Sequence, residues 1–142
     1  MSASTTAYVF ATVLAGLSLS AVGQEYSACG RQLLTEARSL ENLPAEVNSL
    51  LGRGRDGLDG IADRNGKFNV TDVVDNRLPM RRFVLAGFND SCALVAVERG
   101  GRGHWFEVFA FERTNGKWHV EQRWSVDAMP DSLQELRRRV RK

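Results

Sequence analysis

The sequence predicts an α+β domain in which N-terminal helices pack on a twisted antiparallel β-sheet, with a short helix at the C-terminus. Two observations predict it. Apolar residues near the start of the chain recur every three or four positions, which is typical of a helix. Between residues 92 and 124, β-branched and aromatic runs alternate with glycine-containing turns, which predicts an antiparallel meander. The length of 142 residues suits one domain.

Composition excludes several classes of protein. The chain is 43% hydrophobic and 25% charged, so it is neither disordered nor a repetitive fibrous protein. Its 19 basic and 17 acidic side chains give a net charge of +2. This balance is unlike that of histone-like proteins, and we expect no nucleic-acid partner.

The first 23 residues resemble a secretory signal peptide. They contain no charged side chain, and residues 7–19 form an apolar run that is too short to span a membrane. Small residues stand at Ala21 and Gly23, the two positions that signal peptidase reads. We therefore expect cleavage after Gly23, leaving one domain over residues 24–142 in the periplasm or outside the cell. A buried N-terminal helix and an uncleaved anchor are the alternatives.

The two cysteines, Cys29 and Cys92, predict a disulfide. An even pair in a small exported domain is first interpreted as a bridge, because disulfides persist outside the cytoplasm. A lipid anchor on Cys29 is less favoured, because Tyr26 stands where the lipidation motif usually has leucine. Two cysteines and two histidines scattered along the chain do not have metal-ligand spacing, so we expect neither metal nor cofactor.

Helical periodicity marks the start of the mature chain. Tyr26, Cys29, Leu33, Ala37 and Leu40 fall on one face of a predicted helix. A second short helix is expected from Pro44 to a left-handed cap at Gly52. Residues 52–66 are rich in glycine and polar side chains, which predicts a flexible loop.

Strands are expected over residues 80–88, 92–98, 104–112 and 118–124, with a tight turn at Asn115–Gly116. Arg81 and Arg82 would point to opposite faces of the first, so that one of them could be partly buried against a carboxylate. The third strand is apolar on both faces, so it is either covered on both sides or displays an aromatic patch. In the last strand, alternation places Trp118, Val120, Gln122 and Trp124 on one face and His119, Glu121 and Arg123 on the other.

A C-terminal helix is expected after Pro130, where Ser132 and Glu135 form a capping box. We expect it at an edge of the sheet or on the same face as the N-terminal helices. Its basic end complements the helix dipole and could also contact anionic lipid or cell-wall polymer. That end comprises Arg137, Arg138, Arg139, Arg141 and Lys142. The predicted core comprises Leu33, Leu40, Phe83, Leu85, Leu94, Val108, Trp118 and Val120.

Residues 99–104 form the candidate binding loop. Two arginines and a histidine stand on a glycine-rich turn between two strands, and such a turn could fit an acidic surface. It does not open a helix, so it lacks the geometry of a phosphate-binding loop. The binding residues predicted here are Arg99, Arg102, His104, Trp105, Phe109 and Phe111.

No hydrolase nucleophile elbow, zinc-protease helix or P-loop motif occurs in the sequence, which favours a binding protein over an enzyme. An export signal, one cystine and an α+β domain without a catalytic motif resemble the layout of small periplasmic inhibitors and immunity proteins of bacteria. That resemblance implies an exported protein that binds and inhibits a protein of the cell envelope. The alternative is a small-ligand carrier or enzyme whose pocket is lined by Trp105, Phe109 and Phe111.

Overall fold

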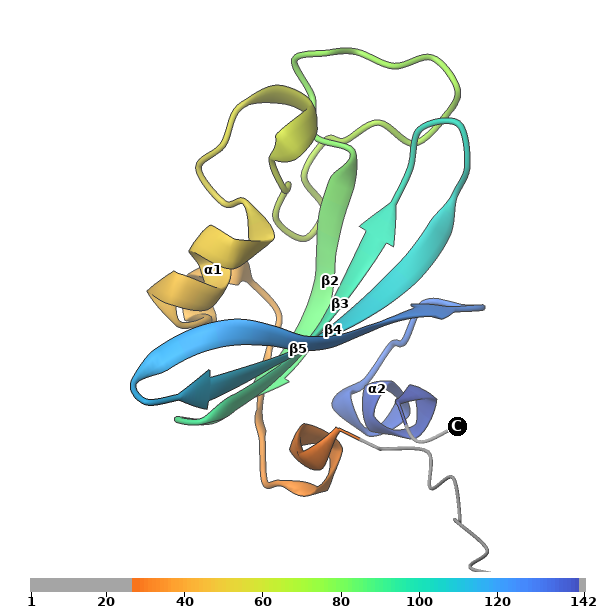
Figure 1. Ribbon diagram of the computed structural model, residues 1–142. Coiled ribbons are helices and arrows are strands. Elements are labelled where there is room, and N and C mark those ends of the chain that lie inside the picture. The colour runs from red at the N-terminus through yellow and green to blue at the C-terminus, as the bar shows by residue number, and fades with distance from the viewer. Residues whose placement is uncertain (1–26, 141–142) are drawn as a thin grey trace, which may run out of the picture.

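The computed structural model describes residues 27–140 and contains a five-stranded antiparallel sheet (Figure 1). The strand order is the chain order, so every neighbouring pair is joined without a crossover. This confirms an α+β domain built on an antiparallel meander. The strands are β1 (Thr35–Ala37), β2 (Arg81–Phe88), β3 (Cys92–Arg99), β4 (Trp105–Thr114) and β5 (Lys117–Val126).

Helices cover both faces of the sheet, α1 on one side and α2 on the other (Figure 1). We call these sides the α1 face and the α2 face. Phe109 and Phe111 of β4 are buried on the α1 face, and Val108 and Ala110 are buried on the α2 face. The doubly apolar strand is therefore covered on both sides. The helices are α1 (Ala45–Leu51) and α2 (Leu133–Arg139), with 3₁₀ turns η1 (Ala28–Arg31), η2 (Leu40–Asn42) and η3 (Gly57–Asp59).

The helix predicted between residues 26 and 40 is wrong for the part that the structure describes. Only the single turn η1 forms there, and β1 then pairs with β2, Thr35 opposite Phe88. Leu33 is 91% exposed instead of buried, whereas Leu40 lies in the core as predicted. The helical spacing is overridden by two long-range constraints, strand pairing and the disulfide.

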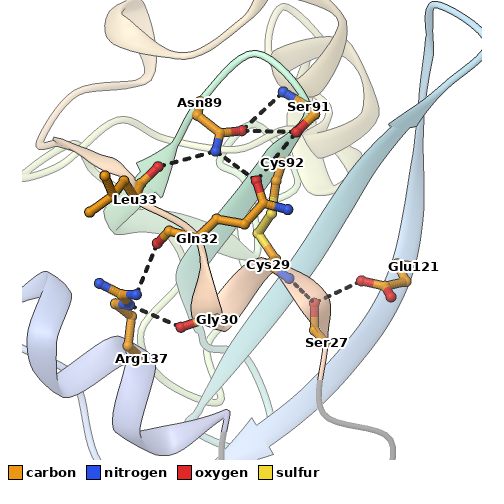
Figure 2. Close-up of a disulfide and its surroundings, with 10 residues drawn as sticks. All are labelled: Ser27, Cys29, Gly30, Gln32, Leu33, Asn89, Ser91, Cys92, Glu121 and Arg137. Atoms are coloured by element: carbon orange, nitrogen blue, oxygen red, sulfur yellow. Dashed lines mark hydrogen bonds between the residues drawn. A yellow bond between two sulfur atoms is a disulfide. The ribbon is translucent and has the colours of Figure 1, made fainter.

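The disulfide between Cys29 and Cys92 is confirmed, with their Cα atoms 5.6 Å apart (Figure 2). It ties η1 to the start of β3. The same region is held by Arg137 of α2, whose guanidinium donates to the carbonyls of Gly30 and Gln32 at 3.0 and 2.9 Å. We call this the disulfide end of the sheet.

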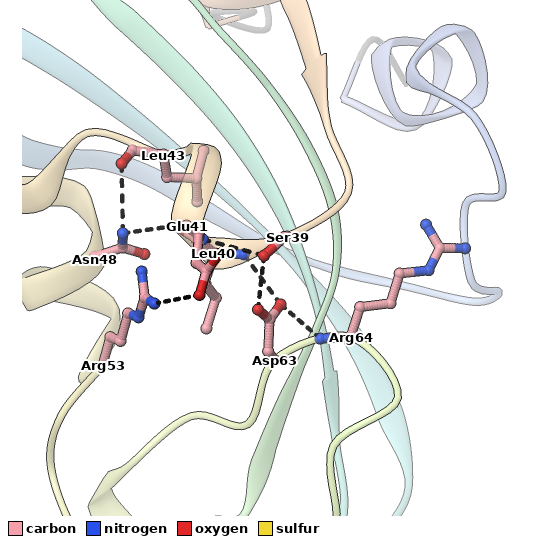
Figure 3. Close-up of polar contacts among 8 residues, drawn as sticks. All are labelled: Ser39, Leu40, Glu41, Leu43, Asn48, Arg53, Asp63 and Arg64. Atoms are coloured by element: carbon pink, nitrogen blue, oxygen red, sulfur yellow. Dashed lines mark hydrogen bonds and ion pairs between the residues drawn. The ribbon is translucent and has the colours of Figure 1, made fainter.

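The helix α1 follows Pro44 and ends at Gly52, which has a φ of 90°, as the sequence predicts. Gly52 donates its N–H to the carbonyl of Ser49 at 3.1 Å. Asn48, buried in α1, donates to the carbonyls of Leu40 and Leu43 and so joins α1 to η2 (Figure 3).

The glycine-rich segment 52–66 is fixed to the rest of the domain at Asp63 (Figure 3). Its carboxylate accepts hydrogen bonds from the Leu40 N–H at 3.0 Å and the Ser39 hydroxyl at 2.8 Å. Burial raises the pKa of Asp63, but these bonds and one from the Arg64 N–H outweigh it, so the net pKa lies below its ordinary value. One residue earlier, the carbonyl of Ala62 accepts from the Phe83 N–H, which attaches the loop to β2.

A β-bulge in β5 overturns the predicted alternation. Ala110 pairs with Gln122 but Phe111 pairs with Val120, so Glu121 is an extra residue. Trp118 therefore packs on the α1 face, Trp124 packs on the α2 face, and Val120 is 46% exposed instead of buried. The turn that precedes β5 is confirmed, with φ of 52° at Asn115 and 78° at Gly116.

The helix α2 lies on the α2 face, opposite α1, and not at an edge or beside α1 as the sequence suggested (Figure 1). Ser132 caps it by accepting from the Glu135 N–H at 3.2 Å. Gly87 of β2 permits the close approach, because a Cβ there would lie 2.2 Å from Leu133 Cδ1. Four further core predictions are confirmed by the burial of Phe83, Leu85, Leu94 and Val108. The predicted core residue Trp118 is half-buried.

The predicted signal peptide, its cleavage site, and Arg141 and Lys142 lie outside the described residues. Within residues 27–140, no helix is long and apolar enough to cross a membrane.

Candidate functional site

The turn between β3 and β4 closes one end of the sheet, opposite the disulfide end (Figure 1). We call residues 99–105 the arginine tip. Gly100 donates its N–H to the carbonyl of Met80 at 3.0 Å, so the tip packs on the segment that precedes β2. A Cβ on Gly100 would lie 1.8 Å from the carbonyl oxygen of Asn69, so only glycine allows this contact.

That neighbouring segment, residues 69–79, is organised by the buried side chain of Asn69. Its amide donates to the carbonyls of Asp75 and Leu78 at 3.0 and 2.9 Å, and its oxygen accepts from the Asp75 N–H at 2.8 Å. The two ends of the segment meet where the Asn69 N–H donates to the Pro79 carbonyl at 2.9 Å. We call it the valine loop, because it exposes Val70 and, to 85%, Val73.

On the α2 face, the base of the tip is held by the buried carboxylate of Glu98. Arg82 binds one of its oxygens through Nε at 3.0 Å and Nη2 at 2.5 Å, and His104 Nε2 lies 2.7 Å from the other. The Arg82 guanidinium also lies 4.4 Å from the centre of the Phe68 ring. The expectation that one arginine of the Arg81–Arg82 pair is partly buried against a carboxylate is confirmed for Arg82.

On the α1 face, the buried carboxylate of Glu107 holds the base of the tip, as Glu98 does on the α2 face. Its Oε1 accepts from Trp105 Nε1 at 3.1 Å and pairs with Arg123 Nη2 at 3.2 Å. Arg99 Nη1 lies 3.6 Å from Oε2, which has no hydrogen-bond partner among the described residues. The Arg99 guanidinium is also 5.5 Å from the centre of the Trp105 ring, so the carboxylate, Arg99 and Trp105 fix one another.

Positive charge exceeds negative charge on the α1 face of this end. Arg81, Arg99 and Arg123 surround the carboxylate of Glu107, and Arg55 and Asp59 also act on Arg81. Burial lowers the pKa of Arg81, and repulsion from Arg99 lowers it further. The uncompensated charge favours an anion that approaches this end of the molecule.

The structure gathers four of the six predicted binding residues at the tip. Arg99, Arg102, His104 and Trp105 all lie there, with Arg102 exposed and Trp105 37% exposed. Phe109 and Phe111 lie further along β4 in the core of the α1 face, 7% and 0% exposed.

Sequence reasoning did not assign a role in supporting the tip to Asn69, Glu98 or Glu107. One signal for them was present, since Glu107 interrupts a strand that is otherwise apolar on both faces. A buried charge in such a strand requires partners, and the structure supplies arginines from the two neighbouring strands.

Of the three described arginines at the basic end of α2, two are engaged within the molecule. Arg137 is bound to carbonyls at the disulfide end, and Arg139 bridges Asp127 and Glu135. Arg138 is exposed. Among residues 27–140, no group of three histidine, cysteine or acidic side chains is placed to hold a metal ion.

No family model, curated protein or solved structure matches this sequence. Glu98 and Glu107 lie on opposite faces of the sheet, and each is paired with arginine. The arrangement presents cations and an indole at this end of the sheet, supported by two buried carboxylates.

Proposed function

We propose that this chain is a small exported binding protein that recognises an acidic surface of a cell-envelope protein through the arginine tip. The observation that carries the proposal is the pair of buried carboxylates. Glu98 and Glu107 hold His104, Arg99 and Trp105 in place before any partner arrives. Side chains that are already ordered lose less entropy on binding, so a small surface can bind tightly.

The composition of the tip also suits a protein interface. Tryptophan and arginine are the side chains most often found at energetic hot spots, and Trp105 and Arg102 are both accessible here. Val73 of the adjoining valine loop adds exposed apolar surface. The excess of arginine would accelerate association with an acidic partner at low ionic strength.

The disulfide supports a compartment outside the cytoplasm, which agrees with the signal-peptide interpretation of residues 1–23. An inhibitor or immunity-type protein of the envelope combines these properties. The carrier alternative gains no support from the aromatic residues, because Phe109 and Phe111 pack among the core side chains of the α1 face.

The test is affinity capture from an envelope extract, with the full chain expressed and recovered from the envelope fraction. Mass spectrometry of the recovered protein should find Gln24 at the N-terminus and both cysteines oxidised. We expect an acidic protein to be retained at low salt and released as salt is raised.

Two tip variants and one control make the capture specific. Arg102→Glu and Trp105→Ala should each reduce retention by about tenfold or more. Arg31→Glu reverses an exposed arginine at the disulfide end and should leave retention unchanged. The tip would not be the interface if all three variants lost retention equally, or if Arg102→Glu left retention unchanged.

A further inference from the structure

A cleft is lined by residues of α2 and by the last residues of β5 and those that follow it, away from the aromatic residues of the predicted site. Its volume is about 450 Å³, within the range of about 300–1,000 Å³ typical of small-molecule sites. Trp124 and Val126, which pack partly on the core of the α2 face, provide an apolar floor. Ser125, Asp127 and Arg138 add polar groups at its rim.

Arg139 fixes one wall of this cleft. Its guanidinium pairs with Asp127 and, at 2.7 Å, with Glu135. The hydrogen bond from Arg139 lowers the pKa of Glu135 to about 2. Glu135 therefore stays ionised at neutral pH, and its ion pair with Arg139 is present without a ligand.

Among the described residues that line the cleft, the formal charges cancel. Two arginines, Arg138 and Arg139, face two carboxylates, Asp127 and Glu135. An ion gains little net attraction from such a site. A neutral ligand rich in hydroxyls suits it better, because hydroxyls can donate to Asp127 and accept from Arg138 at the same time. The apolar face of a sugar ring can pack on the indole of Trp124.

We propose that this cleft binds a neutral oligosaccharide, with one sugar ring stacked on Trp124 and its hydroxyls hydrogen-bonded to Ser125, Asp127 and Arg138. This site lies apart from the arginine tip and does not depend on the protein partner proposed there. It would give the chain a second ligand, of a different chemical class.

The three tryptophans provide the test, because each reports on a different place. Trp105 lies at the tip, Trp118 lines a smaller cleft with Glu46 and Asp90, and Trp124 lines the proposed site. The ¹⁵N-labelled protein is titrated with maltotetraose, cellotetraose and chitotetraose. We expect at least one of these sugars to shift the indole signal of Trp124 saturably. The indole signals of Trp105 and Trp118 should not shift.

Variants and salt then separate this proposal from its competitors. Trp124→Leu should weaken binding by about tenfold, and Asp127→Ala by about threefold or more. Asp127 is 88% exposed, so its replacement tests the site even if Trp124→Leu impairs folding. Asp90→Ala in the smaller cleft is the control and should bind as the parent does.

Several results would overturn the proposal. One is an indole signal of Trp124 that none of the three sugars shifts. Others are a shift that is larger for Trp105 or Trp118 than for Trp124, and binding that both Trp124→Leu and Asp127→Ala leave unchanged. A steep loss of binding between about 50 and 500 mM NaCl would also overturn it, because a neutral ligand gives little salt dependence.

Discussion

The two ends of the sheet are held together by different forces. At the disulfide end, a covalent bond joins η1 to β3, and Arg137 ties α2 to the same turn. At the arginine tip, two buried carboxylates and the amide of Asn69 hold the turns together. We therefore expect one end of the sheet to be sensitive to reductant and the other to the loss of single polar groups.

Loss of the disulfide should have the largest effect. Cys29 and Cys92 are 63 residues apart, and a bridge of that span contributes on the order of 4 kcal/mol to the free energy of unfolding. Urea unfolding of a Cys29→Ala, Cys92→Ala variant should show this loss. In this variant, hydrogen exchange should accelerate more at the backbone amide of position 92 than at the amide of Trp105. Equal acceleration at both ends would mean that the two ends are not separately held.

Removal of the carboxylate charge at Glu107 should rank second. Glu107→Gln leaves Arg99 and Arg123 without their anionic partner, at a cost of about 2 kcal/mol. Chemical denaturation measures the cost, and the Trp105 indole signal should shift as its hydrogen bond changes. Glu112→Gln, at an exposed position of the same strand, is the control. Equal effects of the two variants would refute the role of Glu107.

Asp63 should contribute less, and in a pH-dependent way. Its pKa is lowered in the folded state, so its contribution is present above the ordinary aspartate pKa and disappears as pH falls through the folded value. Asp63→Asn should cost about 1 kcal/mol at neutral pH, and the difference from the parent should vanish in strong acid. Unfolding measured from neutral to low pH tests this. Asp72→Asn, an exposed control, should leave the curve unchanged.

The smallest effect is expected at Arg77, whose ion pair with Asp75 lies on the surface of the valine loop. This arginine lowers the pKa of Asp75 to about 2 through hydrogen bonds. Because Arg77 is 89% exposed, water screens the pair, and Arg77→Ala should leave the denaturation midpoint unchanged. A clear loss of stability would show that the valine loop depends on its surface charges as well as on Asn69.

Local signals in the sequence predicted the local structure well. Gly52, Asn115–Gly116 and Ser132 each act through one or two residues, so their caps and turns formed where expected. The strands 81–88, 92–99 and 105–114 also follow from their own composition. In these places no distant contact was needed to decide the structure.

The wrong predictions are those that long-range contacts decide. Residues 28–40 have helical spacing, but the bond to Cys92 and the pairing of β1 with β2 leave Leu33 in solvent. The bulge at Glu121 could not be predicted from local sequence either, because it depends on the pairing register of β4 and β5. It moves Trp118 and Trp124 to opposite faces.

The candidate site divides in the same way. The glycine turn placed Arg99, Arg102, His104 and Trp105 together, because they are neighbours in the chain. Their supports come from other strands and loops, so Asn69 and Arg123 could not be recognised from spacing alone.

The bulge in β5 also changes the edge that the sheet presents to a second chain. This strand is one of the two edges of the sheet, and the backbone groups along its free side could template a second chain. The extra residue at Glu121 breaks the regular spacing of those groups, and exposed charges at Lys117, Glu121 and Arg123 oppose a flat, dry contact. The β-bulge that places Trp118 and Trp124 on opposite faces therefore also disfavours edge-to-edge pairing along β5.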